Sequence, residues 1–89
     1  MKIIESAEEN SELFHSRGML YFADQSYKKA ILDFEKVIEL NQSRLPDAFF
    51  YKGLANLLLG STDCESLLKA KLLGYQAEWK NFAILCPNL

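Results

Sequence analysis

Cysteine and histidine are scarce in this chain, and their scarcity limits the kinds of site it can build. Its 89 residues include one histidine, His15, and two cysteines, Cys64 and Cys86, which do not form a Cys-x-x-Cys pair. A disulfide framework and a zinc site are therefore not expected. We predict two free thiols, which are typical of a reducing compartment, and neither a metal site nor a cofactor.

Long apolar runs and basic stretches are also missing. The longest apolar run, Leu54 to Leu59, is interrupted by Asn56 and is too short to cross a bilayer. The net charge is −2 and the longest basic run is Lys28-Lys29, whereas nucleic-acid binders usually carry a basic stripe. Residues 1–5 lack the apolar core of a signal peptide. We predict a cytoplasmic protein that binds neither nucleic acid nor a membrane.

What the chain does contain is typical of one small globular domain. Apolar residues make up 49% of it and charged residues 25%, which excludes a disordered chain. A chain of this length forms one domain and buries only about 60–65% of its unfolded surface. Its stability margin is therefore expected to be small.

Helix signals punctuate the first two thirds of the sequence. Ser6 and Glu9 have the spacing of a capping box, which predicts a helix that starts near Ala7. Apolar residues at helical spacing predict a second helix over residues 27–40. A third helix is expected to begin at Pro46, which suits the first helical position, and to end before Gly60 at its C′ position.

Two more helices complete the expected fold. Thr62 and Glu65 form a second capping box, so a fourth helix should run from there to Gly74, and a short fifth helix should precede Pro87. No window alternates with the period of two that a strand needs. The chain is therefore expected to be all-α with five helices in a single domain, 1–89. Its expected parts are an N-terminal segment 1–6, a first repeat 7–42, a second repeat 46–74 and a capping helix 76–85.

A repeated pattern relates the first and third helices. An aromatic, a basic residue and a glycine recur after about 35 residues. Each copy is followed by a helix that carries a small residue and, four positions later, a second residue of the pattern. The copies are Phe14, Arg17, Gly18 and Tyr21, followed by Ala30 and Phe34, and then Phe49, Lys52, Gly53 and Asn56, followed by Ser66 and Ala70. This pattern resembles the tetratricopeptide repeat (TPR), a helical repeat with a period of about 34 residues. The resemblance implies antiparallel helix pairs stacked as a short right-handed superhelix.

The repeated glycines have a physical explanation. Glycine inside a helix costs about 1 kcal/mol relative to alanine, so Gly18 and Gly53 are expected where a neighbouring helix crosses closely. Ala30 would then face Gly18 as a small residue. The space around that crossing would be filled by Phe14, Tyr21 and Phe34, and Phe49 is the corresponding aromatic of the second copy. Arg17 and Lys52 depart from the family pattern, because a leucine usually precedes the glycine.

A second face of these helices predicts a binding site. His15, Met19 and Phe22 share one side of the first helix, at spacing i, i+4 and i+7. In the TPR family this face lines the concave groove that binds ligands, and here it is mostly apolar. The resemblance therefore implies a partner-binding groove formed by His15, Met19, Phe22, Phe50, Leu54, Leu57 and Leu58.

An apolar groove needs a cover, because large exposed apolar patches on soluble proteins usually mark partner sites. Three covers are open: an amphipathic helix of a partner, a second copy of the chain, or its own ends, such as Ile3-Ile4 or the Trp79 helix. We favour an adaptor or chaperone-like subunit that binds an apolar helical segment of another protein. Small TPR-like chaperones of type III secretion are similar in size, acidity and groove character. The alternative is a self-associating scaffold module that uses the groove for homo-oligomerisation.

Two other functions are not expected. TPR proteins of the carboxylate-clamp type need charge-assisted donors in the groove, where this chain has His15 and Met19. An enzyme is not expected either, since no glycine-rich phosphate loop or metal-ligand cluster is present. His15 has no nucleophile near it in sequence, although a triad assembled in space with Cys64 or Cys86 stays open.

Overall fold

The computed structural model describes residues 10–89, and every regular element in that range is a helix. The elements are α2 (Ser11–Ala23), α3 (Tyr27–Leu40), α4 (Leu45–Leu58), α5 (Cys64–Leu72) and α6 (Trp79–Phe82). The prediction of an all-α chain with five helices is confirmed for this range. None of these helices is long and apolar enough to cross a membrane.

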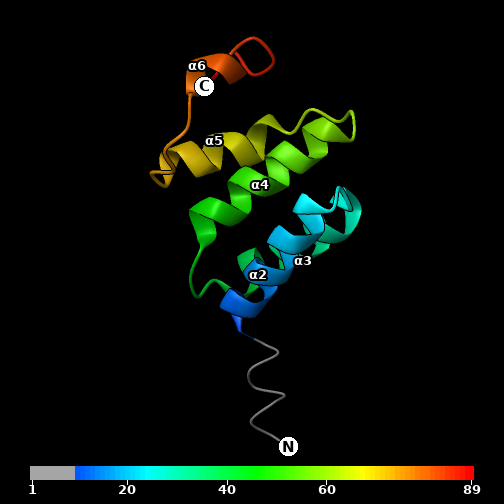
Figure 1. The fold of residues 1–89 in the computed structure, drawn as a ribbon. Helices are drawn as coiled ribbons and strands as arrows, with labels where there is room; N and C mark the ends of the chain where they lie inside the picture. The colour runs from blue at the N-terminus through cyan, green and yellow to red at the C-terminus, as the bar shows by residue number, and fades with distance from the viewer. Residues whose placement is uncertain (1–9) are drawn as a thin grey trace, which may run out of the picture.

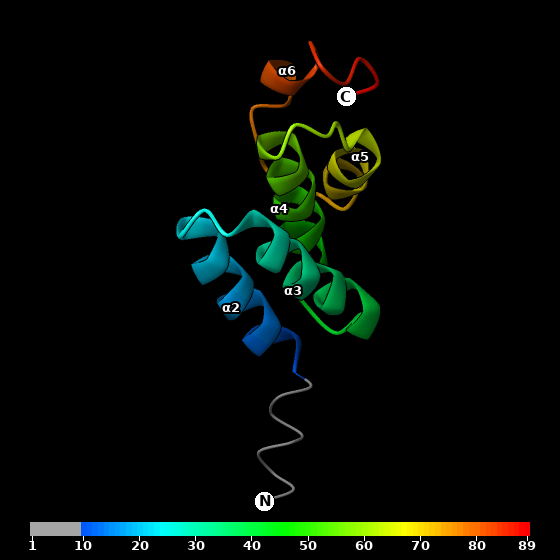
Figure 2. The ribbon, with the colours of Figure 1, turned by 90° about the vertical axis from the view of Figure 1, so that its right-hand side faces the viewer.

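The helices pack against one another in the order in which they occur in the chain. α2 packs on α3, α3 on α4 and α4 on α5, so each of these helices packs on the one before it in the chain. Figure 1 shows α2 and α3 at one end of this stack and α6 at the other. In the turned view of Figure 2, α4 lies between the α2–α3 pair below it and α6 above it, with α5 beside its upper part. α4 is therefore the central helix of the fold.

The start of α2 differs from the sequence prediction. The helix begins at Ser11 and not near Ala7, because Asn10 has an extended backbone and caps it. The side-chain oxygen of Asn10 accepts a hydrogen bond from the backbone N–H of Glu12 at 2.6 Å. The expected capping box of Ser6 and Glu9 lies outside the described residues.

The next two helices agree closely with the sequence prediction. α3 spans residues 27–40, as its apolar spacing predicted. α4 begins one residue before Pro46, which lies in its first turn, and it ends at Leu58. Gly60 follows with a φ of +92°, a left-handed conformation that glycine adopts without strain, so its predicted role in ending α4 is confirmed.

The cap of α5 is Asp63, and the prediction of Thr62 was wrong by one residue. The Asp63 carboxylate accepts a hydrogen bond from the backbone N–H of Ser66 at 3.2 Å and another from the Asn56 side chain at 2.8 Å. Burial alone would raise the pKa of Asp63, but these hydrogen bonds outweigh it and hold that pKa below its ordinary value. The contact with Asn56 on α4 decides which residue caps the helix.

The prediction of free thiols is wrong, because Cys64 and Cys86 form a disulfide. Cys64 is the first residue of α5, and Cys86 lies in the last turn of the chain, with 5.5 Å between their Cα atoms. The same closure explains why α6 has four residues, Trp79–Phe82, and does not extend over 76–85 as predicted. The chain turns after Phe82 to bring Cys86 back to α5, which leaves Ile84 87% exposed.

Two apolar cores are stacked along the molecule. The first contains Ala30, Phe34, Val37 and Ala48, which are fully buried between α2, α3 and α4. The second contains Phe50, Leu67, Ala70 and Cys86, between α4, α5 and the C-terminal residues. Tyr51 of α4 packs against both cores and joins them.

Close helix crossings are present at both glycines of the repeated pattern, as predicted. A Cβ atom on Gly18 would lie 2.9 Å from Cε1 of Phe34, and one on Gly53 would lie 2.8 Å from Cγ of Leu67. Both distances are too short for a real contact, so a side chain at either position would push the helices apart. The atoms nearest to Gly18 belong to Phe34 and Asp33, however, and not to Ala30, which is buried elsewhere in the first core.

Arg17 of α2 forms an ion pair with α3. Its guanidinium donates two hydrogen bonds to the buried carboxylate of Asp33, at 2.9 and 2.8 Å. It also lies over the rings of Phe14 and Tyr21, 5.6 and 5.8 Å from their centroids. The hydrogen bonds with Asp33 raise the pKa of Arg17 further above its ordinary value, so the guanidinium stays charged.

Replacing Gly18 tests the first crossing. We expect Gly18→Leu to lower the free energy of unfolding by about 1–3 kcal/mol, the usual effect of overpacking. Ser16→Leu is the matched control, because Ser16 is exposed on the same helix and a change there should stay within about 0.5 kcal/mol. Urea denaturation followed by circular dichroism measures both. Equal stabilities of the two variants would show that α2 and α3 do not cross closely at Gly18.

Removing Arg17 alone from the Arg17–Asp33 pair should destabilise the fold more than replacing both partners. Arg17→Met leaves the buried Asp33 carboxylate without its donor, which should cost about 1–3 kcal/mol. Lys52→Met is the control, since Lys52 pairs at 3.6 Å with a largely solvated Glu35 and such pairs contribute at most about 1 kcal/mol. Adding Asp33→Leu to Arg17→Met should recover part of the loss, because no unpaired charge is then buried. A control as damaging as Arg17→Met would refute the assignment.

The cap of α5 can be tested through its pH dependence. Asp63→Ala should lower the free energy of unfolding by about 1–2 kcal/mol at neutral pH, and Thr62→Ala should change it by less than half as much. Because the folded-state pKa of Asp63 is lowered, its stabilisation is present above an unfolded-state pKa of about 3.9. It is lost as the pH falls through the folded-state value. Unfolding measured from pH 7 to pH 2 should show the wild type and Asp63→Ala converging in acid, and a constant gap would contradict this.

Candidate functional site

The predicted groove residues come from α2 and α4, and side chains bridge these two helices. The rings of Phe22 on α2 and Tyr51 on α4 meet edge to face, with 5.2 Å between their centroids. At the other end, Nε2 of His15 on α2 lies 3.3 Å from a carboxylate oxygen of Asp47 on α4. The structure therefore places the two halves of the predicted groove on adjacent helices.

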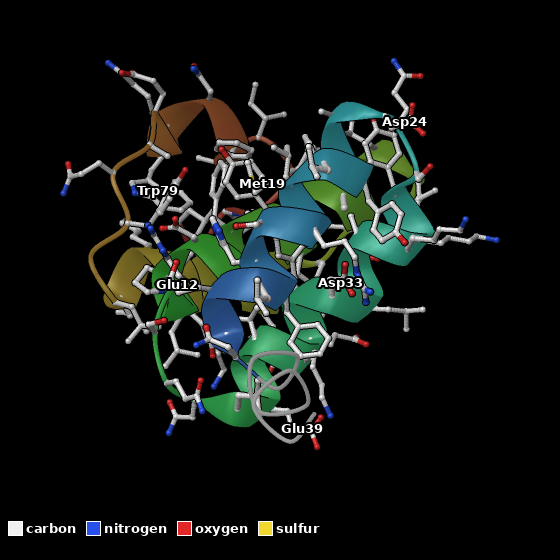
Figure 3. The ribbon with its side chains drawn as sticks, turned by 60° about the horizontal axis from the view of Figure 1, so that its bottom comes forward. Glu12, Met19, Asp24, Asp33, Glu39 and Trp79 are labelled. Atoms are coloured by element: carbon white, nitrogen blue, oxygen red, sulfur yellow. A yellow bond between two sulfur atoms is a disulfide. The ribbon has the colours of Figure 1, made fainter. Side chains whose placement is uncertain are left out.

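The α2 half of the groove is partly used by the core. His15, Met19 and Phe22 are all half-buried, and both Met19 and Phe22 pack against the first core. Phe22 has a second edge-to-face contact with Tyr27, at 5.3 Å. Figure 3 shows Met19 near the middle of the view, with Glu12 and Trp79 on one side of it and Asp33 on the other. The outward part of Met19 is what α2 adds to this surface.

Phe50 of the α4 half is closed off by the chain itself. Its side chain stacks on Tyr75 with 4.4 Å between centroids, and Trp79 and Phe82 each approach it edge to face at 5.8 Å. Only 8% of Phe50 stays exposed. Phe50 is therefore not an open groove residue, and of the three covers considered for it, the Trp79 helix is the one observed. The other end considered, Ile3-Ile4, lies outside the described residues.

The rest of α4 keeps an apolar surface. Leu54 and Leu57 are half-buried against the second core, and Leu58 is 52% exposed at the end of the helix. These three positions are spaced i, i+3 and i+4, so they share one side of α4. The open part of the predicted groove is therefore a short leucine row on α4, while Met19 of α2 is half-buried against the first core.

A polar cluster lies at the start of α2 and α4. The Arg44 guanidinium donates a hydrogen bond to Glu12 at 3.2 Å and lies 3.8 Å from Asp47, which in turn approaches His15. The hydrogen bond from Arg44, followed by one from Ser43, lowers the pKa of Glu12. Because each charge here has an opposite charge beside it, the cluster holds α2 and α4 together and offers no free cation to a carboxylate ligand.

The structure also answers the question of a cysteine nucleophile. Cys64 and Cys86 are joined to each other, so neither can act as the thiolate of a triad with His15 while the bridge is intact. Nε2 of His15 is buried, and its approach to Asp47 does not have hydrogen-bond geometry. Residues 10–89 contain no group of three His, Cys, Asp or Glu side chains that could hold a metal ion.

Sequence reasoning missed an apolar hollow between the start of α4 and the end of α5. The hollow has a volume of about 340 Å³ and is lined by Leu45, Phe49, Lys69, Leu72 and Leu73. Leu72 is 75% exposed, and the Lys69 ammonium lies 5.9 Å from the centre of the Phe49 ring. The pair Leu72-Leu73 just before Gly74 was the available signal, since two leucines at a helix end are seldom both core residues.

Sequence reasoning also missed two tyrosines that join the cores. Tyr51 contacts Phe22 and Phe50, and Tyr75 stacks on Phe50. Burial, and next the Tyr51 hydroxyl, raise the pKa of Tyr75 well above its ordinary value, so it stays neutral. The aromatic residues that were assigned to the groove therefore form part of a larger aromatic cluster.

Comparison with known proteins found no matching family model, no matching curated protein and no matching solved structure. The resemblance to the TPR family therefore depends on the pattern of residues within this chain.

Proposed function

We propose that this chain is a protein-binding module of the tetratricopeptide type, an adaptor or chaperone-like subunit that binds an apolar helical segment of another protein. The observation that carries the proposal is the leucine row Leu54, Leu57 and Leu58 on α4, which ends at the half-exposed Leu58. An amphipathic helix binds a groove through apolar residues at the same i, i+3, i+4 spacing, so two such faces can interlock.

Two further features support a TPR-type module. The glycines Gly18 and Gly53 occupy equivalent places in successive helix pairs, and each lies at a close crossing. The helices also pack in chain order, as they do in repeat proteins, where each unit contacts its neighbours. These features support stacked helix pairs with α2 and α4 side by side on the binding face.

The charge distribution favours a basic amphipathic partner. The chain has a net charge of −2, and at the polar end of the face the Glu12 and Asp47 carboxylates share one guanidinium, that of Arg44, which leaves an excess of negative charge. Lysines or arginines beside the partner's apolar row would be attracted to this end, while its apolar residues would cover the leucines. A secreted or membrane-active segment held by a chaperone of the type III secretion kind would have this chemistry. The proposed role is binding, with no catalytic step.

A self-associating scaffold module is the second candidate. The hollow lined by Leu45, Phe49 and Leu72 is apolar and lies on α4 and α5, so a second copy could bury it. The cytoplasmic location stays a prediction from the sequence. Its argument from two free thiols no longer applies, because the thiols are bridged.

Leu58→Glu tests the proposed binding face. Leu58 is more than half exposed, so the fold should tolerate the change, whereas Leu54 and Leu57 pack on the core and would confound the test. We expect Leu58→Glu to weaken binding of a synthetic leucine–lysine amphipathic helix at least tenfold, since burying a leucine contributes about 1.5–3 kcal/mol. Leu32→Glu, at an exposed leucine on α3, should leave the affinity unchanged.

Titration calorimetry measures both affinities, and sedimentation of the same samples reports self-association. Equal affinities for the two variants would place the binding surface elsewhere. A different outcome would support the scaffold module instead. In that case neither variant nor the wild type binds the peptide, and the wild type forms a dimer that Leu72→Glu dissociates.

A further inference from the structure

Residues 75–89 form a cover over one end of the proposed binding face. Trp79 and Phe82 lie against Phe50, and Leu89 packs on the same second core. Without this cover, Phe50 would extend the leucine row along α4, because it lies one helical turn before Leu54. The segment thus buries an apolar ring that would otherwise belong to the open surface.

The cover has little regular structure of its own. Its one helix, α6, has four residues, and the indole N–H of Trp79 bonds within the segment, to the carbonyl of Tyr75. A helix this short is not stable by itself. Besides aromatic packing, the segment is attached to α5 by Lys71, which donates a hydrogen bond to the carbonyl of Leu89, and by the covalent bond between Cys64 and Cys86.

We propose that the Cys64–Cys86 disulfide is a redox-controlled latch that keeps residues 75–89 over Phe50. When the bond is reduced, the segment leaves α4 and Phe50 becomes accessible. The apolar face then extends beyond Leu54 to Phe50. The opening stands on the structure alone. Its consequence for binding rests on the proposed function, since it makes the reduced chain the form that binds an apolar helix better.

The bond is placed where a reductant can reach it. Cys86 is fully buried, but Cys64 is partly exposed, and the bond borders a surface hollow of about 280 Å³ that is also lined by Glu65, Leu68, Asn88 and Leu89. A thiolate of a dithiol reductant attacks one sulfur, the S–S bond breaks, and the departing cysteine thiolate takes a proton from water. The second reductant thiol then displaces the other cysteine. Two electrons pass to the protein, which gains two thiols, and the reductant becomes a cyclic disulfide.

The first core contains no residue of the cover. The first core is formed by α2, α3 and α4, and its buried members are Ala30, Phe34, Val37 and Ala48. The disulfide closes a loop with a sequence separation of 22 residues. In the chain-entropy treatment, opening such a loop shifts the local equilibrium toward the open state on the order of a hundredfold. Reduction is therefore expected to release residues 75–89 while α2 and α3 stay folded.

Hydrogen exchange on the full chain tests the latch directly. With dithiothreitol, amides of residues 79–86 should exchange on the order of a hundredfold faster, while those of α3 keep their rates. Trp79 is the single tryptophan, so its fluorescence should shift to the red as it leaves Phe50. The double variant Cys64→Ser, Cys86→Ser should be open without reductant and should not respond to it.

Binding of the leucine–lysine amphipathic helix then tests the consequence. The reduced chain and the double serine variant should bind it at least tenfold more tightly than the oxidised chain. Unchanged exchange and fluorescence on reduction would overturn the latch, whatever the peptide does. If residues 75–89 are released on reduction but both redox forms bind the peptide with equal, measurable affinity, the disulfide does not control binding. Opening without peptide binding in either form would refute the proposed function and leave the latch supported.

Discussion

The packing of Tyr51 is the contact on which the rest of the structure depends. This residue lies on the central helix α4, and its ring meets Phe22 and Phe34 on one side and Phe50 and Tyr75 on the other. It therefore joins two cores that are each small for a chain of this length. A small domain buries a limited share of its surface, so a residue that packs on both cores adds to the stability of each.

The same aromatic cluster limits which part of the molecule can bind a partner. Two residues of the predicted groove pack on Tyr51, and this leaves Phe22 half-buried and Phe50 buried. What stays at the surface is the outward side of α4, where Leu54 and Leu58 follow Phe50 at one-turn intervals. The proposed binding face is thus the exposed continuation of a row of residues that begins inside the core.

The C-terminal segment links this row to the disulfide. Phe50 is closed by Trp79 and Phe82, and the segment that carries them is fastened to α5 by Cys64 and Cys86. A covalent bond at the edge of the second core can therefore control the accessible length of the apolar row. The first core lies on the opposite side of α4, which allows the cover to move without unfolding α2 and α3.

The sequence by itself determined the features that depend on neighbours a few positions away: the extent of α3, the helix end at Gly60 and the glycines at both crossings. Only the tertiary structure decided which residue caps α5, because Asp63 is chosen by a hydrogen bond from Asn56 on another helix. It likewise decided that Cys64 and Cys86 pair and that Phe50 is covered. Such outcomes depend on which distant segments meet in space, and helical periodicity carries no information about that distance.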